Sequence, residues 1–172
     1  DCISLQSITL SQNITAINGY TFSGWTGSNG TTPQTVVQIQ KGTTGDKTYT
    51  ANWQSSLVAQ AIYSATDNSL TFIRDTLKTQ GGTFVDQSGK TKTVTRVYTG
   101  FEDAPEYYAP WKSDGTIDIM SNTTSVYFKD KISPLNTRSW FSEFVNCSSF
   151  NVTNLDPSRA DSMSWMFYGC SE

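Results

Sequence analysis

The chain has 172 residues, of which 36% are hydrophobic, 13% aromatic and 16% charged, and its net charge is −3. No basic cluster supplies the positive surface that nucleic-acid binding needs, and no apolar stretch approaches the about 18 residues of a membrane span. Few aliphatic side chains and many rings and hydroxyls favour thin, sheet-rich modules of an extracellular protein. Because no signal peptide opens the sequence, we interpret it as a mature or trimmed segment.

Residues 1–54 form the first predicted module, in which short β-prone runs alternate with turn signals. Strands are expected at residues 3–10, 20–22, 35–39 and 47–53. In the last of these, Tyr49, Ala51 and Trp53 share one face because they alternate along the strand. The rings of Tyr20, Phe22 and Trp25 are expected to meet that face, which gives the module a small aromatic core.

Residues 55–138 form a second, less regular region that is also predicted to be rich in β-strands. The apolar runs 61–63 and 70–73 flank the turn-forming residues 66–69, a pattern typical of a β-hairpin. The stretch from 100 to 111 holds two prolines and is predicted to be a packed loop or a short helical turn. Another strand is expected at 124–129.

Residues 139–172 contain an internal repeat. The matching pairs, which define the predicted register, are Ser139/Ser162, Phe144/Phe167, Cys147/Cys170 and Ser148/Ser171. The spacing from position 139 to position 162 falls in the range of leucine-rich repeats, whose coils combine a short strand with a helical or irregular return and stack on one another. We expect a strand at 150–153 and a helical return at 161–167, capped by Asp161 or Ser162. Phe144 is expected to lie over Phe167.

Two stretches resemble families of bacterial surface proteins. Gly-Tyr-Thr-Phe-Ser-Gly-Trp at 19–25, followed by residues 27–31 and 41–53, resembles the Listeria–Bacteroides repeat, the B-repeat type of internalin B. Residues 150–158 and 163–171 are similar to the BspA-type leucine-rich repeat. The first resemblance implies a β-grasp-like module that acts as a stalk or auxiliary binder, and the second implies a repeat array with an N-terminal cap.

The expected fold class is therefore mainly β with minor α. A β-grasp-like module at residues 1–54 precedes a β-rich cap at 55–138 and the start of an incomplete leucine-rich-repeat solenoid at 139–172. The sequence stops just after Gly169, Cys170 and Ser171. We expect the last coil to lack a cap and either to self-associate through that end or to be disordered.

The three cysteines, Cys2, Cys147 and Cys170, do not make a disulfide framework. We interpret Cys147 and Cys170 as small apolar side chains stacked in successive coils, with a disulfide between them as the alternative. Because the chain has no histidine and no Cys-x-x-Cys, we expect neither a metal site nor a cofactor.

Acidic residues gather in two places in the second region. Glu102, Asp103 and Glu106 are interpreted as a solvated loop, with the paired carboxylates of a glycosidase as the alternative. Asp114 and Asp118 flank Gly115 but lack the order of a calcium loop. We therefore expect no catalytic residues.

Tyr107, Tyr108 and Trp111 are the candidate ligand platform, because exposed rings can stack on a sugar or a peptide. Burial of these rings in the core is the alternative. As the BspA resemblance implies, the expected function is adhesion of a secreted or cell-surface protein to an extracellular or host protein, such as a matrix protein. The alternatives are an architectural spacer and a carbohydrate-binding module.

Overall fold

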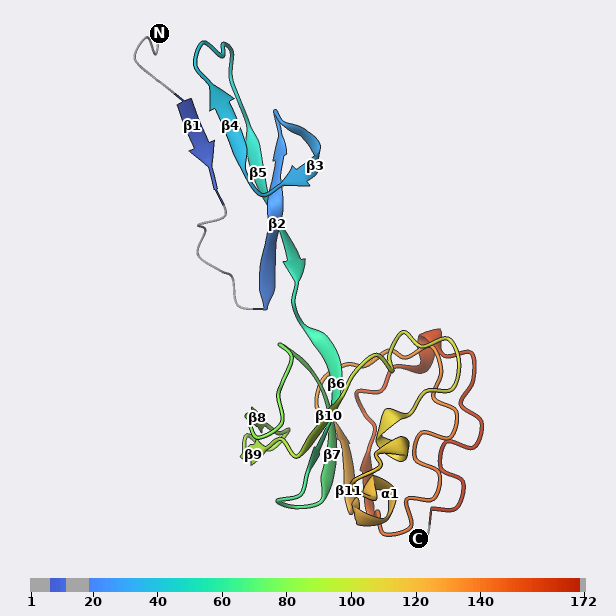
Figure 1. The fold of residues 1–172 in the computed structure, drawn as a ribbon. Helices are drawn as coiled ribbons and strands as arrows, with labels where there is room; N and C mark the ends of the chain where they lie inside the picture. The colour runs from blue at the N-terminus through green and yellow to red at the C-terminus, as the bar shows by residue number, and fades with distance from the viewer. Residues whose placement is uncertain (1–6, 12–18, 171–172) are drawn as a thin grey trace. The chain divides into compact units, whose positions relative to one another are not determined.

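The computed structural model describes residues 7–11 and 19–170 of the chain (Figure 1). The fold is mainly β, with 39% strand and 7% helix, which confirms the predicted class at that level. The described residues do not show a leucine-rich-repeat solenoid. The chain divides into two compact units, residues 1–56 and residues 57–172, and each is described separately below.

The described part of the first unit consists of two small antiparallel sheets. In one, β1 (Ser7–Leu10) pairs with β4 (Val37–Gln40). In the other, β2 (Tyr20–Gly27) lies between β3 (Gly30–Gln34) and β5 (Tyr49–Ser55). Residues 3–6, the start of the first predicted strand, lie outside the described residues.

A cluster of rings joins β2 to β5. The ring centroid of Phe22 lies 5.5 Å from that of Trp25 and 5.6 Å from that of Trp53, as predicted. Tyr20, the third ring expected in this cluster, is instead 46% exposed. Gly24 follows a bulge in β2 and has a φ of 135°. A Cβ atom there would lie 2.7 Å from the backbone nitrogen of Gln34, so the close approach of β3 requires glycine.

The second unit is built on a five-stranded sheet with the order β10-β6-β7-β11-β12. Its strands are β6 (Val58–Ser64), β7 (Ser69–Asp75), β10 (Arg96–Tyr98), β11 (Ser125–Phe128) and β12 (Ser149–Asn151). The β6–β7 hairpin was predicted, whereas the parallel pairing of β11 with both β7 and β12 was not. A separate hairpin and three short helices complete the unit: β8 (Thr83–Val85), β9 (Thr91–Thr93), η1 (Pro110–Ser113), α1 (Ile119–Asn122) and η2 (Pro157–Arg159).

Aromatic rings dominate the core of this unit, and Phe72 of β7 lies among them. Its ring stacks on Phe128 at 4.2 Å between centroids and meets Trp111 edge-on at 5.2 Å. Trp140 and Phe141 lie against the same ring. The residues on either side of position 138, where a domain boundary was predicted, therefore share one core.

Two stretches near the C-terminus have the same backbone conformation. We call residues 135–144 the inner turn segment and residues 161–170 the outer turn segment, and their traces run side by side in Figure 1. Each contains the same run of bends and turns, and Asn136 pairs with Ser162 in a parallel bridge, which defines the observed register. The predicted register, which aligns Ser139 with Ser162, is therefore wrong for this stretch.

The short helix η2 explains the difference. Upstream of it, Ile132 pairs with Leu155, as the predicted register requires, and η2 then places three more residues in the later copy. As a result Phe167 stacks on Phe141, at 5.7 Å between ring centroids, and no ring contact joins it to Phe144 among the described residues.

The predicted helical return at 161–167 is also wrong. Trp165 and Gly169 have positive φ values of 62° and 71°, which a right-handed helix does not contain. The two described cysteines, Cys147 and Cys170, are free thiols. In the observed register Cys170 is equivalent to Phe144, not to Cys147, and Cys2 lies outside the described residues.

Candidate ligand-binding surface

The candidate site is an open groove of about 530 Å³ in the second unit. Its side chains come from four neighbouring stretches: the loop before η1, η1 itself and the two turn segments. The residues used below are Tyr107, Lys112, Arg138, Glu143, Trp165 and Tyr168. They come together because the inner and outer turn segments lie edge to edge and η1 packs against the inner one.

Two large rings stand exposed on the outer turn segment. Trp165 is 64% exposed and Tyr168 is 62% exposed, and their ring centroids lie 5.3 Å apart. In the observed register these residues replace Ser139 and Ser142 of the inner turn segment. Two exposed rings side by side form an apolar patch, which makes this a candidate binding surface.

The backbone of Trp165 adds a second indication. Its φ of 62° lies in the left-handed region, which is uncommon for a bulky residue and costs roughly 1–2 kcal/mol. The adjacent segment imposes this conformation, because the N–H of Ser139 donates to the carbonyl of Ser164 at 3.0 Å. Strained residues cluster at functional sites, where the surrounding structure determines their conformation.

Charged groups of both signs line the groove beside these rings. The ammonium of Lys112 donates to the carbonyls of Ser139, at 3.3 Å, and Ser142, at 3.1 Å, and burial lowers the pKa of Lys112. Neither Arg138 nor Glu143 has an ion-pair partner within the described part of the chain. One guanidinium and one carboxylate are therefore available to a ligand.

The predicted platform is wrong in one of its three residues. Tyr107 and Tyr108 are about half exposed, at 47% and 46%, and Tyr107 lines the groove. Trp111 is fully buried, and its indole N–H donates to the carbonyl of Trp140 at 2.9 Å. Sequence reasoning missed Trp165 because the predicted register placed it at a repeat position with no special role.

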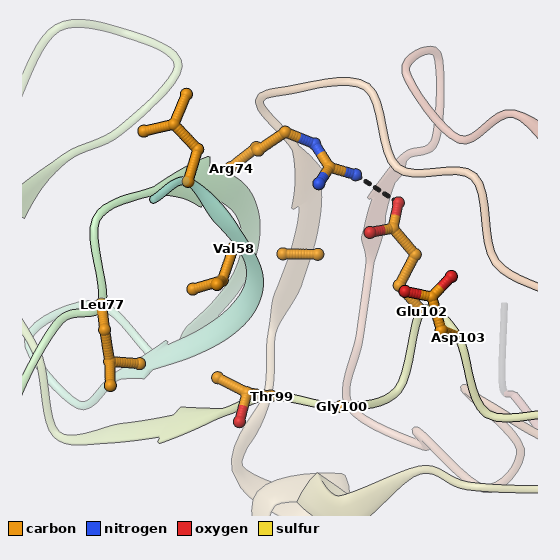
Figure 2. Close-up of a pocket in the computed structure, with 9 residues that line it drawn as sticks. Val58, Arg74, Leu77, Thr99, Gly100, Glu102 and Asp103 are labelled. Atoms are coloured by element: carbon orange, nitrogen blue, oxygen red, sulfur yellow. Dashed lines mark hydrogen bonds and ion pairs between the residues drawn. The ribbon is translucent and has the colours of Figure 1, made fainter. Parts of the chain in front are cut away.

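A second hollow, of about 410 Å³, is shown in Figure 2. Val58 and Leu77 provide apolar walls, and Arg74 forms an ion pair with Glu102. Glu102 also accepts from the N–H of Ser133 at 2.9 Å. The Glu102 carboxylate is therefore already paired with Arg74 and bonded to the backbone. The hollow does not offer the free pair of carboxylates that a glycosidase needs.

Asp114 and Asp118, the second acidic pair, have structural partners as well. Asp114 accepts from Tyr98 at 2.7 Å and Arg96 at 3.1 Å, and hydrogen bonds from Thr116 and Tyr98 hold its pKa well below the usual range. Asp118 caps α1 by accepting from the N–H of Ser121 at 3.0 Å. These carboxylates are committed to the fold, and they do not converge on a calcium position.

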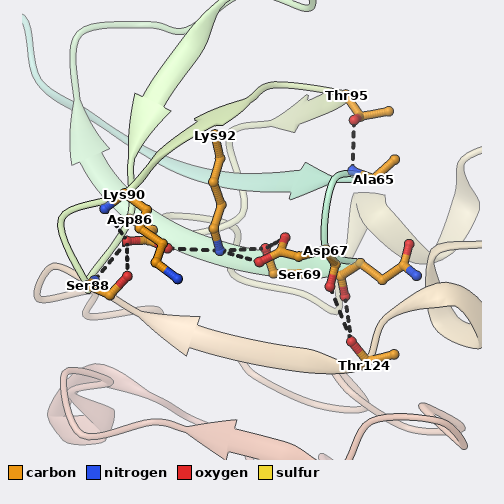
Figure 3. Close-up of polar contacts among 10 residues, drawn as sticks. Ala65, Asp67, Ser69, Asp86, Ser88, Lys90, Lys92, Thr95 and Thr124 are labelled. Atoms are coloured by element: carbon orange, nitrogen blue, oxygen red, sulfur yellow. Dashed lines mark hydrogen bonds and ion pairs between the residues drawn. The ribbon is translucent and has the colours of Figure 1, made fainter.

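Figure 3 shows a buried polar cluster around Lys92 of β9. Its ammonium contacts the carboxylates of Asp67, at 2.6 Å, and Asp86, at 3.0 Å. Asp86 also accepts from the N–H of Ser88 at 2.8 Å. Because every charge in the cluster is paired, it ties the β8–β9 hairpin to the turn between β6 and β7 and offers no group to a ligand.

Within the described residues, no group of three or more Cys, Asp or Glu side chains is placed to hold a metal ion. None of the described helices has the length and apolar character needed to cross a membrane. Comparison with protein-family models, with curated proteins and with solved structures finds no match to this chain.

Proposed function

We propose that this chain is a non-catalytic binding segment of a secreted or cell-surface protein, and that it attaches to an extracellular protein through the aromatic groove. The observation that carries the proposal is the pair of exposed rings, Trp165 and Tyr168, beside the unpaired guanidinium of Arg138. Trp, Tyr and Arg are the residues that contribute most of the binding energy at protein interfaces. A groove that combines all three suits a polypeptide ligand.

We infer further that the two turn segments are successive coils of a repeat array whose N-terminal cap is the rest of the second unit. Their common turn pattern and the parallel pairing of β7, β11 and β12 support this inference. Stacked coils give a rigid frame, which holds the groove residues in place before a ligand arrives. The first unit would then act as a stalk or auxiliary module of the internalin B-repeat type.

The test is retention of the chain on immobilised fibronectin and fibrinogen. We expect the wild type to be retained and Trp165→Gly to wash through, since glycine removes the ring and suits the left-handed backbone. Leu77→Ser is the matched control, because Leu77 is also an exposed apolar residue, 62% exposed, but lines the hollow of Figure 2. Equal retention of the two variants, or no retention of the wild type, would contradict the proposal.

Exposed rings also favour one other ligand class, carbohydrates, which stack on aromatic faces. A glycan array separates the two candidates. Hits that depend on Trp165 would replace the protein ligand with a sugar, whereas an array without hits supports the protein-binding proposal.

A further inference from the structure

A row of backbone hydrogen bonds holds the two turn segments together. Four N–H groups of the inner turn segment donate to four carbonyls of the outer turn segment, at distances of 2.7 to 3.0 Å. The donor–acceptor pairs are Thr137/Ser162, Ser139/Ser164, Phe141/Met166 and Glu143/Tyr168. Donors and acceptors both occur at every second residue, so this edge of the inner turn segment presents N–H groups alone.

The outer turn segment repeats this arrangement on its far side. In the observed register, the four donors correspond to the N–H groups of Met163, Trp165, Phe167 and Gly169. Their backbone follows the same turns, so these groups face away from the inner turn segment. Among the described residues none of the four has a hydrogen-bond acceptor, and all four residues are exposed.

This edge has a chemical preference, because it consists of donors without acceptors. The carbonyls that alternate with the donors already accept bonds from the inner turn segment. Two copies of the edge would place N–H groups against N–H groups, so a symmetric dimer cannot form through it. The self-association that we expected through the last coil therefore cannot occur by symmetric pairing of this edge.

A head-to-tail pairing is blocked at the opposite side of the stack. The matching acceptors of the inner turn segment include the carbonyls of Trp140 and Ser142. Trp111 donates its indole N–H to the first at 2.9 Å, and Lys112 donates to the second at 3.1 Å. Side chains from η1 therefore occupy two of the four acceptors that a second copy would need.

We propose that the outer edge, the four free N–H groups of the outer turn segment, binds an extended polypeptide segment that presents carbonyl oxygens at every second residue. The same kind of pairing already occurs within the fold, because the N–H groups of the inner turn segment bind such a segment, residues 162–168. An apolar side chain of the partner would cover Phe167, which lies 5.2 Å from Phe150 between ring centroids, as Phe167 itself covers Phe141.

The test uses the full chain and a synthetic peptide with the sequence of residues 155–170. We expect saturable binding that slows amide hydrogen exchange by about tenfold or more at the four donor residues. Exchange at Met166 and Tyr168 should stay unchanged, because their N–H groups already donate within the outer turn segment, to Met163 and Trp165. Nuclear magnetic resonance resolves this alternation residue by residue.

The control is the same peptide with the carbonyls at the positions of Ser164 and Met166 reduced to methylene groups, which should weaken binding by about tenfold or more. Equal binding of both peptides, protection of consecutive residues, or no saturable binding up to about 1 mM would overturn the proposal. So would a dimer of the chain alone that protects the same four amides.

This inference depends on backbone groups, whereas the proposed function depends on side chains of the groove. Trp165→Gly separates the two, because glycine keeps the N–H group and loses the ring. We expect this variant to bind the peptide and protect Met163 and Phe167 whether or not the wild type is retained on matrix proteins. Loss of peptide binding in a folded Trp165→Gly protein would count against the backbone edge.

Discussion

Trp165 combines two properties that folding alone does not favour, a left-handed backbone and a large ring in water. Both add cost to the folded state, yet the ring makes little contact with the core. Ser139, the equivalent residue of the inner turn segment, has the same backbone conformation with a small side chain. The contrast indicates that the fold requires the backbone conformation at this position but not the ring, which the proposed function assigns to binding.

The first prediction follows from that contrast. Trp165→Gly should leave the free energy of unfolding unchanged or raise it by about 1 kcal/mol, since glycine adopts positive φ without strain. Denaturant unfolding measures the difference. A loss of more than about 1 kcal/mol would mean that the ring supports the fold, and the binding role assigned to it would lose its main argument.

The second prediction concerns Asp86 in the buried cluster. Burial alone raises the pKa of this carboxyl, but the hydrogen bonds from Lys92 and Ser88 outweigh it and hold the pKa well below its usual range. A lowered pKa stabilises the fold above the unfolded-state value of about 4, and this stabilisation is lost as the pH falls further. The wild type should therefore lose more stability than Asp86→Asn between about pH 5 and pH 2.

At pH 7 Asp86→Asn should be less stable than the wild type by about 3 kcal/mol, because the buried Lys92 then loses its buried partner and keeps only the exposed Asp67. Urea unfolding across the pH range gives both comparisons. Other carboxyls with lowered pKa values, such as Asp114, titrate in both proteins and cancel in the difference. Parallel pH profiles for the two proteins would show that the Lys92 cluster does not stabilise the fold.

Among the elements, η1 closes one side of the stacked turn segments through the indole of Trp111. Trp111 and Trp140 are both fully buried, so the effects of substituting them can be compared directly. The indole N–H of Trp111 has an acceptor, whereas that of Trp140 has none among the described residues. Each substitution to phenylalanine removes a similar ring volume, but only Trp111→Phe removes a hydrogen bond.

The third prediction is that Trp111→Phe destabilises the chain more than Trp140→Phe, by about 1–3 kcal/mol, because the carbonyl of Trp140 is then left buried without a donor. Thermal or denaturant unfolding of the two variants gives the difference. If Trp140→Phe is equally or more destabilising, the indole hydrogen bond of Trp111 does not contribute to holding η1 against the inner turn segment.

The same elements show how far the sequence could predict the structure. Apolar runs on either side of a polar turn were enough to predict the β6–β7 hairpin, because the signal is local. Matched residues were enough to find the repeat but not its register, since the insertion at η2 changes the register only after residue 155. Exposure of Trp165 depends on that register, and burial of Trp111 depends on long-range contacts with Phe72 and Trp140. The candidate site could therefore be predicted only in part, through Tyr107.

At the scale of the whole molecule, the two units differ in their cores. In the first, Val37 is the one buried hydrophobic side chain among the described residues, and the rings of Phe22, Trp25 and Trp53 are half-buried. The second has a continuous core from β6 to the outer turn segment. A small module with so little burial is marginal in stability.

The fourth prediction is therefore two separate thermal transitions, the first from residues 1–56 and the second from residues 57–172. Differential scanning calorimetry of the full chain detects them. Trp53→Ala should lower the first transition temperature and leave the second unchanged. A single cooperative transition, shifted as a whole by this substitution, would show that the two units unfold together.

The central claim is that the outer turn segment and its groove form the binding surface. The most direct test is hydrogen–deuterium exchange of the full chain with and without whichever of fibronectin and fibrinogen retains it. We expect new protection at residues 162–170 and around Tyr107, and no change at residues 19–56. Protection confined to the first unit, or to the hollow that contains Leu77, would contradict the claim.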